Sequence, residues 1–260
     1  MSDASTQPSG FGMALGIAGR RAAVAGASGG LGLATAKALA AAGVHVAICA
    51  RNEERLAAAA SAVGHGCVPL VADVSTAEGG EAFVAAATSA LGGVDILIAN
   101  AGGPPPGDFA STPIDRYRTG IDLSLMSVVG MCKAAIPAMQ AQRWGRVVAI
   151  TSISVRQPIG TLILSNTARA GVTGFLKTVA TEVAGDGVTV NTAQPGIHAT
   201  ERMTQLYGGT PDAGSLGIPA GVVGDPDDFG HVVAFLCSEH AKFITGTQLH
   251  IDGGAYGGLL

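Results

Sequence analysis

The stretch Arg21-Ala-Ala-Val-Ala-Gly-Ala-Ser-Gly-Gly-Leu-Gly32 predicts how this chain folds. An apolar run at residues 22–25 is typical of a buried strand, and a helical run follows at residues 31–42. Three glycines stand between the two runs, at Gly26, Gly30 and Gly32. Glycine permits a tight turn and lets the backbone approach a phosphate, while the following helix offers free N–H groups. The stretch therefore predicts a strand–turn–helix unit that binds a diphosphate, rather than an ordinary Gly-rich turn.

The rest of the chain alternates short apolar runs with longer alanine-rich segments. Further strands are predicted at residues 44–49, 68–71, 94–99, 147–151, 188–192 and 248–251. Further helices are predicted at residues 53–63, 76–91, 114–142, 165–184 and 226–238. Unbroken apolar strands that alternate with helices indicate a parallel sheet covered on both faces. We expect a single α/β domain in three layers, with a doubly wound, seven-stranded parallel sheet of the Rossmann type.

Composition narrows the function classes. The 260 residues carry a formal charge of −4, which argues against a nucleic-acid partner, since such a partner favours a basic stripe. The four cysteines and six histidines are scattered without ligand spacing, so we expect reduced thiols and no metal site. The polar first ten residues favour neither a signal peptide nor a membrane span. A cytoplasmic protein fits this composition best.

Ligands of open parallel sheets lie beyond the carboxyl ends of the strands. That rule selects the residues that follow the predicted strands: Gly26, residues 49–52, Asp73, residues 100–103, Thr151, Ser152 and residues 194–196. The segment 197–224 is rich in Gly, Pro and polar residues and is predicted to be a long loop or small lid beside the site.

Several of these markers, in this order, resemble the short-chain dehydrogenase/reductase family. The resemblance is carried by Gly26, Gly30, Gly32, Asp73-Val74, Asn100-Ala101-Gly102, Ser152, Asn191, Pro195-Gly196, Thr200 and Asp252-Gly253-Gly254. It implies a nicotinamide dinucleotide cofactor, hydride transfer between a carbonyl and an alcohol and, commonly, a homotetramer. It also implies an N-terminal extension at residues 1–19 and an oxidoreductase domain at residues 20–260, whose substrate loop is at about 197–224.

The end of the second strand bears on the choice of cofactor. A protein that binds the 2′-hydroxyl form normally presents a carboxylate there. This chain has Arg51 and Asn52 instead, and an arginine fork pairs well with a 2′-phosphate. NADP is therefore expected rather than NAD, although Arg51 could also be a solvated arginine at the start of a helix.

By resemblance, the cofactor lies along the carboxyl edge of the sheet. Asp73 would meet the adenine amino group, Val74 would offer a backbone contact, and Asn100 would lie near the adenine ribose and stabilise the central sheet. The full expected set is Gly26, Ser28, Gly29, Gly30, Leu31, Gly32, Arg51, Asn52, Asp73, Val74, Asn100, Ala101, Gly102, Arg169, Pro195, Gly196, Ile197 and Thr200.

The expected catalytic centre departs from the family pattern of Ser, Tyr and Lys with an Asn on the preceding long helix. Ser152 matches the serine, but Ser165 stands at the tyrosine position and Arg169 at the lysine position. Counting back from Pro137, the asparagine position falls on Ser124. Three of the four catalytic positions are therefore altered.

The replaced pair keeps its geometry but changes its chemistry. Ser165 and Arg169 are four residues apart, so they share one face of a helix. A serine hydroxyl is shorter than a tyrosine side chain and holds its proton more tightly than tyrosine, whose pKa is about 10. Arg169 remains a cation that can hold a ribose hydroxyl or a carbonyl oxygen, but it cannot relay a proton as an amine can.

Three explanations of proton transfer remain open. A water in the space of the missing phenol could carry the proton. His198 or Tyr207 could swing in as the acid, although a loop histidine without a role and a lid residue packed on substrate are the simpler interpretations. Alternatively, hydride transfer has been lost.

Two function classes follow from these alternatives. The first is an NADP-dependent oxidoreductase that reduces a ketone or a 3-oxoacyl compound. Its apolar walls would include Ile153, Val155, Ile159, Leu162, Met203 and Leu206. The second is a catalytically impaired dinucleotide-binding protein that acts as a redox sensor or partner subunit. In either case we expect a homotetramer or homodimer, with contacts through residues 165–184 and the uncharged tail at residues 255–260.

Overall fold

The computed structural model describes residues 14–259. They form one seven-stranded sheet in the order β3-β2-β1-β4-β5-β6-β7, and every neighbouring pair is parallel. The strands are β1 (Arg21–Val24), β2 (His45–Ala50), β3 (Val68–Val71), β4 (Ile96–Ala99), β5 (Gly145–Ile150), β6 (Val188–Pro195) and β7 (Gln248–Ile251). The prediction of a seven-stranded doubly wound parallel sheet is confirmed.

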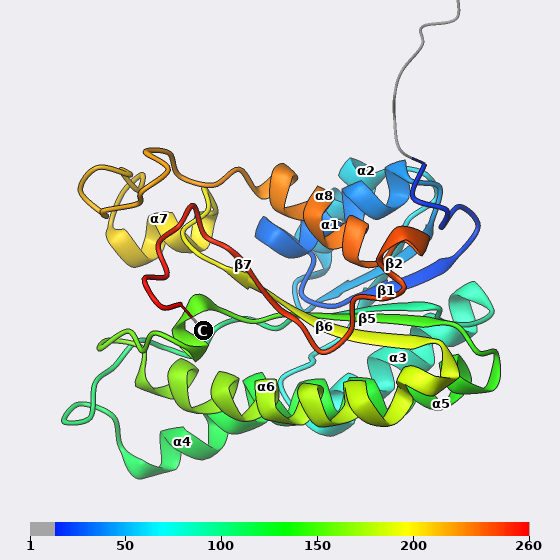
Figure 1. Cartoon of the computed structure of the whole chain (residues 1–260), viewed down its shortest axis with the longest axis horizontal. Helices are drawn as coiled ribbons and strands as arrows, with labels where there is room; N and C mark the ends of the chain where they lie inside the picture. Colours follow the sequence, from blue (N-terminus) through cyan, green and yellow to red (C-terminus); the bar gives the residue numbers. More distant parts are fainter. Residues whose placement is uncertain (1–13, 260) are drawn as a thin grey trace, which may run out of the picture.

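Helices cover both faces of this sheet (Figure 1). One layer holds α1 (Gly30–Ala41), α2 (Glu53–Val63) and α8 (Pro226–Leu236). The other layer holds α3 (Ala77–Leu91), α4 (Ile114–Ile121), α5 (Ser127–Ala141) and α6 (Ile163–Val183). Short 3-10 turns η2 (Ile153–Val155), η3 (Ala184–Asp186) and η4 (Glu239–Ala241) complete these layers.

Alternate residues of each strand enter two separate cores. In β1, Ala23 lies in the core under α3 and α5, whereas Ala22 and Val24 lie in the core under α1 and α8. Both faces are buried, which explains why the strands read as unbroken apolar runs. Cys49, Cys132 and Cys237 are buried in these cores, and burial raises the pKa of each thiol to about 12. Before β1, Ile17 is fully buried in the second core, whereas residues 1–13 of the expected extension lie outside the described residues.

Two segments differ from the sequence prediction. The helix predicted at residues 114–142 is α4 and α5 joined by a π-helical turn, η1 (Asp122–Met126). The segment 197–224, predicted to be a long loop or small lid, contains the short helix α7 (Glu201–Tyr207), which was not predicted. The Thr200 hydroxyl accepts a hydrogen bond from the Met203 N–H at 3.4 Å, and Gly208 ends the helix in the left-handed conformation. Seven residues are too few for helical periodicity to stand out.

The combined helix Ile114–Ala141 is long and apolar enough to span a membrane by length and composition alone. Within the structure its α5 part packs against α3, and Met131, Cys132 and Met139 are fully buried in the core. A buried core helix passes the same test, so this finding is weak evidence for a membrane span.

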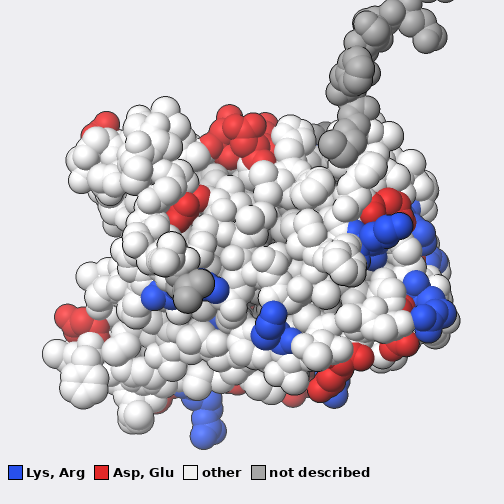
Figure 2. Space-filling model, viewed as in Figure 1, with Lys and Arg blue, Asp and Glu red and all other residues white. Residues whose placement is uncertain are grey.

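Charged groups are sparse on the surface. Figure 2 shows Lys and Arg in small separate groups among uncharged atoms on the face drawn there. This distribution fits a chain in which only 13% of residues are charged. That face presents no continuous basic stripe over the described residues.

A buried carboxylate ties the sheet together at the amino ends of its strands. Asp95 accepts hydrogen bonds from Arg21 Nε at 2.8 Å, Arg21 Nη2 at 2.7 Å and Gln142 Nε2 at 2.9 Å. Burial would raise the pKa of Asp95, but these hydrogen bonds outweigh burial and hold it below its usual range. The network therefore joins the start of β1, the start of β4 and the end of α5.

The substitution Gly130→Ala is expected to loosen the contact between α5 and α3. A Cβ at Gly130 would overlap the carbonyl oxygen of Ala77, which is backbone and cannot rotate away. Overpacking of this kind costs about 2 kcal/mol, so thermal unfolding should show a fall in Tm of about 6 °C. The control is Gly185→Ala, whose Cβ would have no atom within 4 Å. Equal Tm values for the two variants would contradict this account of the packing.

Candidate active site

The Gly-rich turn after β1 has the backbone that a diphosphate site needs. Gly26 and Gly30 have φ values of +59° and +55°, the left-handed region that favours glycine. A Cβ at Gly32 would lie 2.5 Å from the Gly26 carbonyl oxygen. Gly29 begins α1 without a side-chain cap, so the N–H groups of the first turn have no side-chain acceptor there. These features fit a diphosphate held by backbone N–H groups and by the helix dipole.

Asn100 fixes the shape of this turn from the neighbouring strand. It follows β4, and its Nδ2 donates to the carbonyl oxygens of Ala25 at 3.3 Å and Gly26 at 3.1 Å. The side chain thereby links the carboxyl ends of β1 and β4, as the expected stabilising role requires. Ala101 and Gly102 continue from it along the same edge.

Polar groups also follow β2 and β3 at this edge. Arg51 is exposed directly after β2, and Asn52 Oδ1 accepts a hydrogen bond from Arg55 N at 2.8 Å, which caps α2. After β3, Asp73 Oδ1 accepts from Ser75 N at 3.0 Å, and Val74 is buried. The fold thus brings the residues predicted for the adenine end to one side of the Gly-rich turn.

Arg169 lies at the carboxyl end of β5. Its Nη1 donates to the carbonyl oxygens of Ile150 at 3.0 Å and Thr151 at 2.7 Å. Ser152 comes next in the chain, and its hydroxyl oxygen accepts from Ser154 N at 3.1 Å. The structure therefore brings Arg169 next to the backbone that carries Ser152, while Ser165 is buried one turn earlier on α6.

Arg169 remains a cation in this position. Burial lowers the pKa of its guanidinium to about 10, and repulsion from Arg202 acts in the same direction. The group is still protonated at neutral pH. Its Nε is buried without a hydrogen-bond partner within residues 14–259, so this donor is not satisfied by the protein alone.

Ser124 lies in the π-helical turn η1. Its hydroxyl is buried and has no hydrogen-bond partner in the part of the chain that the structure describes. π-helical turns often occur at functional sites, where the extra residue shifts a side chain relative to the regular helix. Ser124 thus provides an unsatisfied hydroxyl at the position where the resemblance expects an asparagine.

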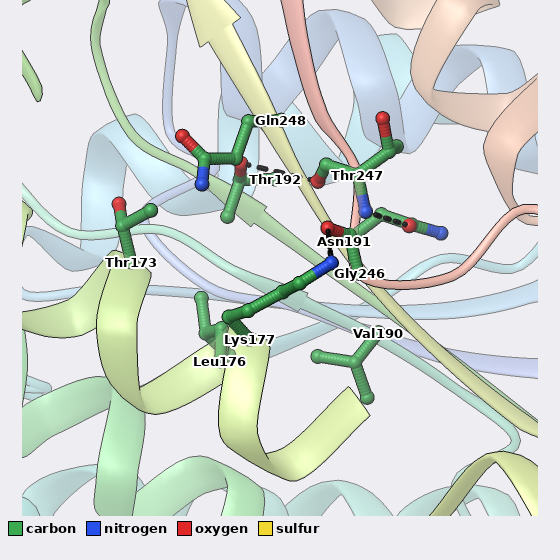
Figure 3. Close-up of a pocket in the computed structure, with 9 residues that line it drawn as sticks. All are labelled: Thr173, Leu176, Lys177, Val190, Asn191, Thr192, Gly246, Thr247 and Gln248. Carbon is green, nitrogen blue, oxygen red and sulfur yellow. Dashed lines mark hydrogen bonds between the residues drawn. The ribbon is translucent and has the colours of Figure 1, made fainter. Parts of the chain in front are cut away.

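Lys177, on the same helix as Arg169, does not replace the missing lysine. Its Nζ donates to the Gly246 carbonyl oxygen at 3.0 Å, in a small hollow between α6 and the strands β6 and β7 (Figure 3). Nearby, Asn191 Nδ2 donates to the carbonyl oxygen of Ile244 and Asn191 Oδ1 accepts from Thr247 N, so Asn191 connects β6 to the loop before β7. This hollow belongs to the packing of the sheet edge.

His198 is packed rather than free to swing. It is 4% exposed, its ring meets Phe229 edge-on at 5.2 Å, and its Nδ1 lies 3.4 Å from the Gly196 carbonyl oxygen. Burial lowers its pKa, which favours the neutral ring. This packing counts against the alternative in which His198 swings in as the acid, and the interpretation as a loop histidine without a role stays a prediction. Tyr207 ends α7 and is 48% exposed.

Arg202 is a candidate that sequence reasoning missed. It lies on α7, and its Nη2 donates to the Pro104 carbonyl oxygen at 3.2 Å beyond β4. A Cβ at Gly103 would come within 2.7 Å of the same nitrogen. The scarcity of arginine in the last part of the sequence is the one signal that could have pointed to Arg202, because Arg169 and Arg202 are the only arginines after Arg156.

The residue before α7 packs against the Gly-rich turn. The methyl group of Thr200 lies 3.5 Å from the position that a Cβ of Gly30 would occupy. Glu201 Oε2 accepts from Arg55 Nη2 at 2.5 Å, which joins α7 to α2. Pro195, Gly196 and Ile197 lead from β6 into this segment. Of the residues expected after β6, Thr200 therefore lies beside the turn after β1.

Known proteins resemble this chain over most of its length. The family described as enoyl-(acyl carrier protein) reductase matches residues 26–256. The 3-oxoacyl-(acyl-carrier-protein) reductase FabG of Vibrio cholerae is 35% identical over 245 residues, covering 92% of this chain and 98% of the relative.

Two solved structures are also similar. One is an NADPH-bound short-chain oxidoreductase of Pseudomonas aeruginosa PAO1 described as containing an atypical catalytic center, with a TM-score of 0.85, 31% identity and coverage of 92% and 97%. The other is L-sorbose reductase of Gluconobacter frateurii in complex with NADPH and L-sorbose, with a TM-score of 0.87, 31% identity and coverage of 95% and 100%.

The matches cover nearly the whole chain, and its fold is that of the similar solved structures. From this evidence, the chain belongs to the short-chain dehydrogenase/reductase family of oxidoreductases.

Proposed function

We propose that this protein is an NADPH-dependent reductase of a ketone or 3-oxoacyl compound with an altered proton-transfer site. The observation that carries the proposal is the junction at the end of β5, where Arg169 is hydrogen-bonded to the Thr151 carbonyl oxygen beside Ser152. The Arg169 guanidinium and the Ser152 hydroxyl are the groups expected to act on a carbonyl oxygen. Both lie at the carboxyl edge of the sheet, as the diphosphate-binding turn does. The NADPH-bound relatives support the choice of reaction class.

The cofactor would be held by the carboxyl edge of the sheet. The turn from Gly26 through Ser28, Gly29, Gly30 and Leu31 to Gly32 offers N–H groups to the diphosphate. Arg51 and Asn52 would hold the 2′-phosphate, which favours NADP over NAD. The adenine side would meet Asp73 and Val74, and the remaining contacts would come from Asn100, Ala101, Gly102, Arg169, Pro195, Gly196, Ile197 and Thr200.

NADPH, when bound, supplies the hydride. The Ser152 oxygen already accepts from Ser154 N, so its own O–H is available to donate to a carbonyl oxygen. Arg169 supplies fixed positive charge where negative charge develops during reduction. Ser165 holds its proton too tightly to replace a phenol. Solvent water, positioned by Ser165 and the unpaired Ser124 hydroxyl, would therefore deliver the proton.

The substitution Ser152→Ala is expected to lower kcat about 100-fold, because it removes one donor to the developing oxyanion. NADPH binding, measured in parallel by fluorescence titration, should stay unchanged. The assay follows NADPH oxidation over a panel of ketones and 3-oxoacyl thioesters. Ser154→Ala is the matched control, since Ser154 is two residues away and its backbone N–H remains in place.

Two results would contradict the proposal. Equal kcat for the two serine variants would remove Ser152 from the mechanism. NADPH binding without turnover of any compound would favour the second class, an impaired dinucleotide-binding protein that senses redox state or serves as a partner subunit. Single substitutions of His198 and Tyr207 would test whether either side chain is the proton donor instead of water.

The remaining features of the proposal concern organisation. The oxidoreductase domain would span residues 20–260 and follow the extension at 1–19, with a substrate loop at about 197–224. Its partners would be a small carbonyl or alcohol substrate and further copies of itself, as a homotetramer or homodimer in the cytoplasm. Light scattering tests the assembly, for which α6 and the tail up to the exposed Leu259 are the proposed contacts; Leu260 lies outside the described residues.

A further inference from the structure

Two arginine side chains lie over the ends of neighbouring strands at the carboxyl edge. Arg169 is bound to carbonyl oxygens at the end of β5, and Arg202 is bound to the Pro104 carbonyl oxygen beyond β4. The strands β4 and β5 are hydrogen-bonded neighbours. Arg202 is close enough for its charge to lower the pKa of Arg169. Both positive charges therefore lie at the carboxyl edge of the sheet, where a substrate would meet the cofactor.

No carboxylate neutralises this pair. Within residues 14–259, no Asp or Glu oxygen lies within 4.0 Å of either guanidinium; the ion pairs of the described residues involve other arginines. The acid next to Arg202 in the chain is Glu201, but it pairs with Arg55. In addition, Arg169 Nε is buried without a partner. Arg169 is partly buried and Arg202 is exposed. Repulsion between their like charges is relieved when an anion lies between them.

The carbonyl contacts leave several guanidinium donors unused. Among the described contacts, Arg202 donates only through Nη2 and Arg169 only through Nη1. Arginine has five N–H donors in a planar fork, which matches the two oxygens of a carboxylate. Because the diphosphate has the N–H groups of the Gly-rich turn and Arg169 is assigned to the cofactor and the carbonyl oxygen, Arg202 is free for a further group on the substrate.

We infer that Arg202, beside Arg169, binds a carboxylate of the substrate, so that the protein prefers an oxo acid to a neutral ketone or ester. This inference rests on the proposed reductase function for the reaction itself, but the binding site can be tested without turnover. Arg202 is then the residue that determines substrate preference, and α7 places its side chain at the site.

The test measures binding of matched acids and methyl esters to the full chain loaded with NADP⁺, in which no ketone can be reduced. The pairs are pyruvate, acetoacetate and levulinate, each against its methyl ester, so that the distance between carbonyl and carboxylate varies. Calorimetry should show at least tenfold tighter binding of one acid than of its ester. Arg202→Gln should remove this preference, and Arg202→Lys should keep part of it.

The control variant is Arg143→Gln, which removes the same charge at the amino ends of the strands, where Arg143 pairs with Asp186 at 3.5 Å. It should keep the preference for the acid. The dissociation constant of NADP⁺ should change less than twofold in the Arg202 variants, which also shows that they are folded.

Three results would overturn the inference. They are equal binding of acid and ester by the unchanged protein for all three pairs, an acid preference that survives Arg202→Gln, and a tenfold weaker binding of NADP⁺ by Arg202→Gln, which would assign Arg202 to the cofactor. The proposed function fails separately. Suppose that none of the ketones supports NADPH oxidation, while the acid still binds more tightly than its ester. The carboxylate site is then supported and the proposed reductase activity is not.

Discussion

Gly32→Ala is expected to weaken NADPH binding about 100-fold, which corresponds to about 2.7 kcal/mol. The new methyl group would lie 2.5 Å from the Gly26 carbonyl oxygen and 3.0 Å from Asn100 Nδ2. Both neighbours are fixed, since Gly26 is backbone and Asn100 is tied to it at 3.1 Å. The turn must therefore shift away from the geometry in which its N–H groups converge on the diphosphate. Fluorescence titration with NADPH measures the effect.

The control for this prediction is Gly185→Ala, which adds the same methyl group where no atom lies within 4 Å. It should bind NADPH like the unchanged protein. Far-ultraviolet circular dichroism should show that Gly32→Ala keeps its fold. If Gly32→Ala binds NADPH as tightly as the control, the diphosphate does not lie on this turn.

Asp95→Ala is expected to lower the free energy of unfolding by about 3 kcal/mol. Removing one partner of a buried ion pair typically costs about 3–5 kcal/mol, and the lower end applies here because Arg21 stays partly open to water. The side chain of Asp95 is 3% exposed and that of Arg21 is 29% exposed. Urea unfolding measures the change. Arg143→Gln, which breaks an exposed ion pair, should cost less than about 1 kcal/mol.

The effect of Asp95 should also depend on pH. Its folded pKa is lowered relative to the unfolded chain, so its stabilisation is present above the unfolded value of about 3.9 and is lost as the pH falls through the folded pKa. The difference in unfolding free energy between the unchanged protein and Asp95→Asn should therefore be constant from pH 5 to 7 and shrink below about pH 4. A difference that stays the same down to pH 3 would show that the ionised carboxylate contributes nothing.

The sheet could be predicted because strands that are buried on both faces consist of unbroken apolar runs, which are visible in the sequence. Strands such as Ile96–Ala99 consist of apolar residues throughout, and the helices between them are long enough to show their period. The π-helical turn at Asp122–Met126 left no such trace, because it interrupts the helix without a proline or a change in composition. The short helix after Thr200 had a cap signal but too few turns for periodicity.

Part of the candidate site could be predicted because its residues follow strands, whereas Ser124, Ser165 and Arg169 were placed only by the family resemblance. Gly26, Asn100 and Ser152 were found from the strands that they follow, because parallel strands place their carboxyl ends on one edge. Arg202 could not be found, since it reaches the edge from a segment whose path depends on tertiary contacts, including the ion pair between Glu201 and Arg55. The packing of His198 against Phe229 likewise joins the segment after β6 to α8, and no local pattern connects the two residues.

The buried network around Asp95 lies at the amino ends of the strands, whereas the arginine pair lies at the carboxyl ends. The two sets share no residue and are separated by the length of the sheet. Substitutions that strengthen the network around Asp95 can therefore raise the melting temperature without changing the geometry of the candidate active site. The α7 segment can be redesigned to accept a new compound while the scaffold remains intact, which makes this chain a convenient starting point for an engineered reductase.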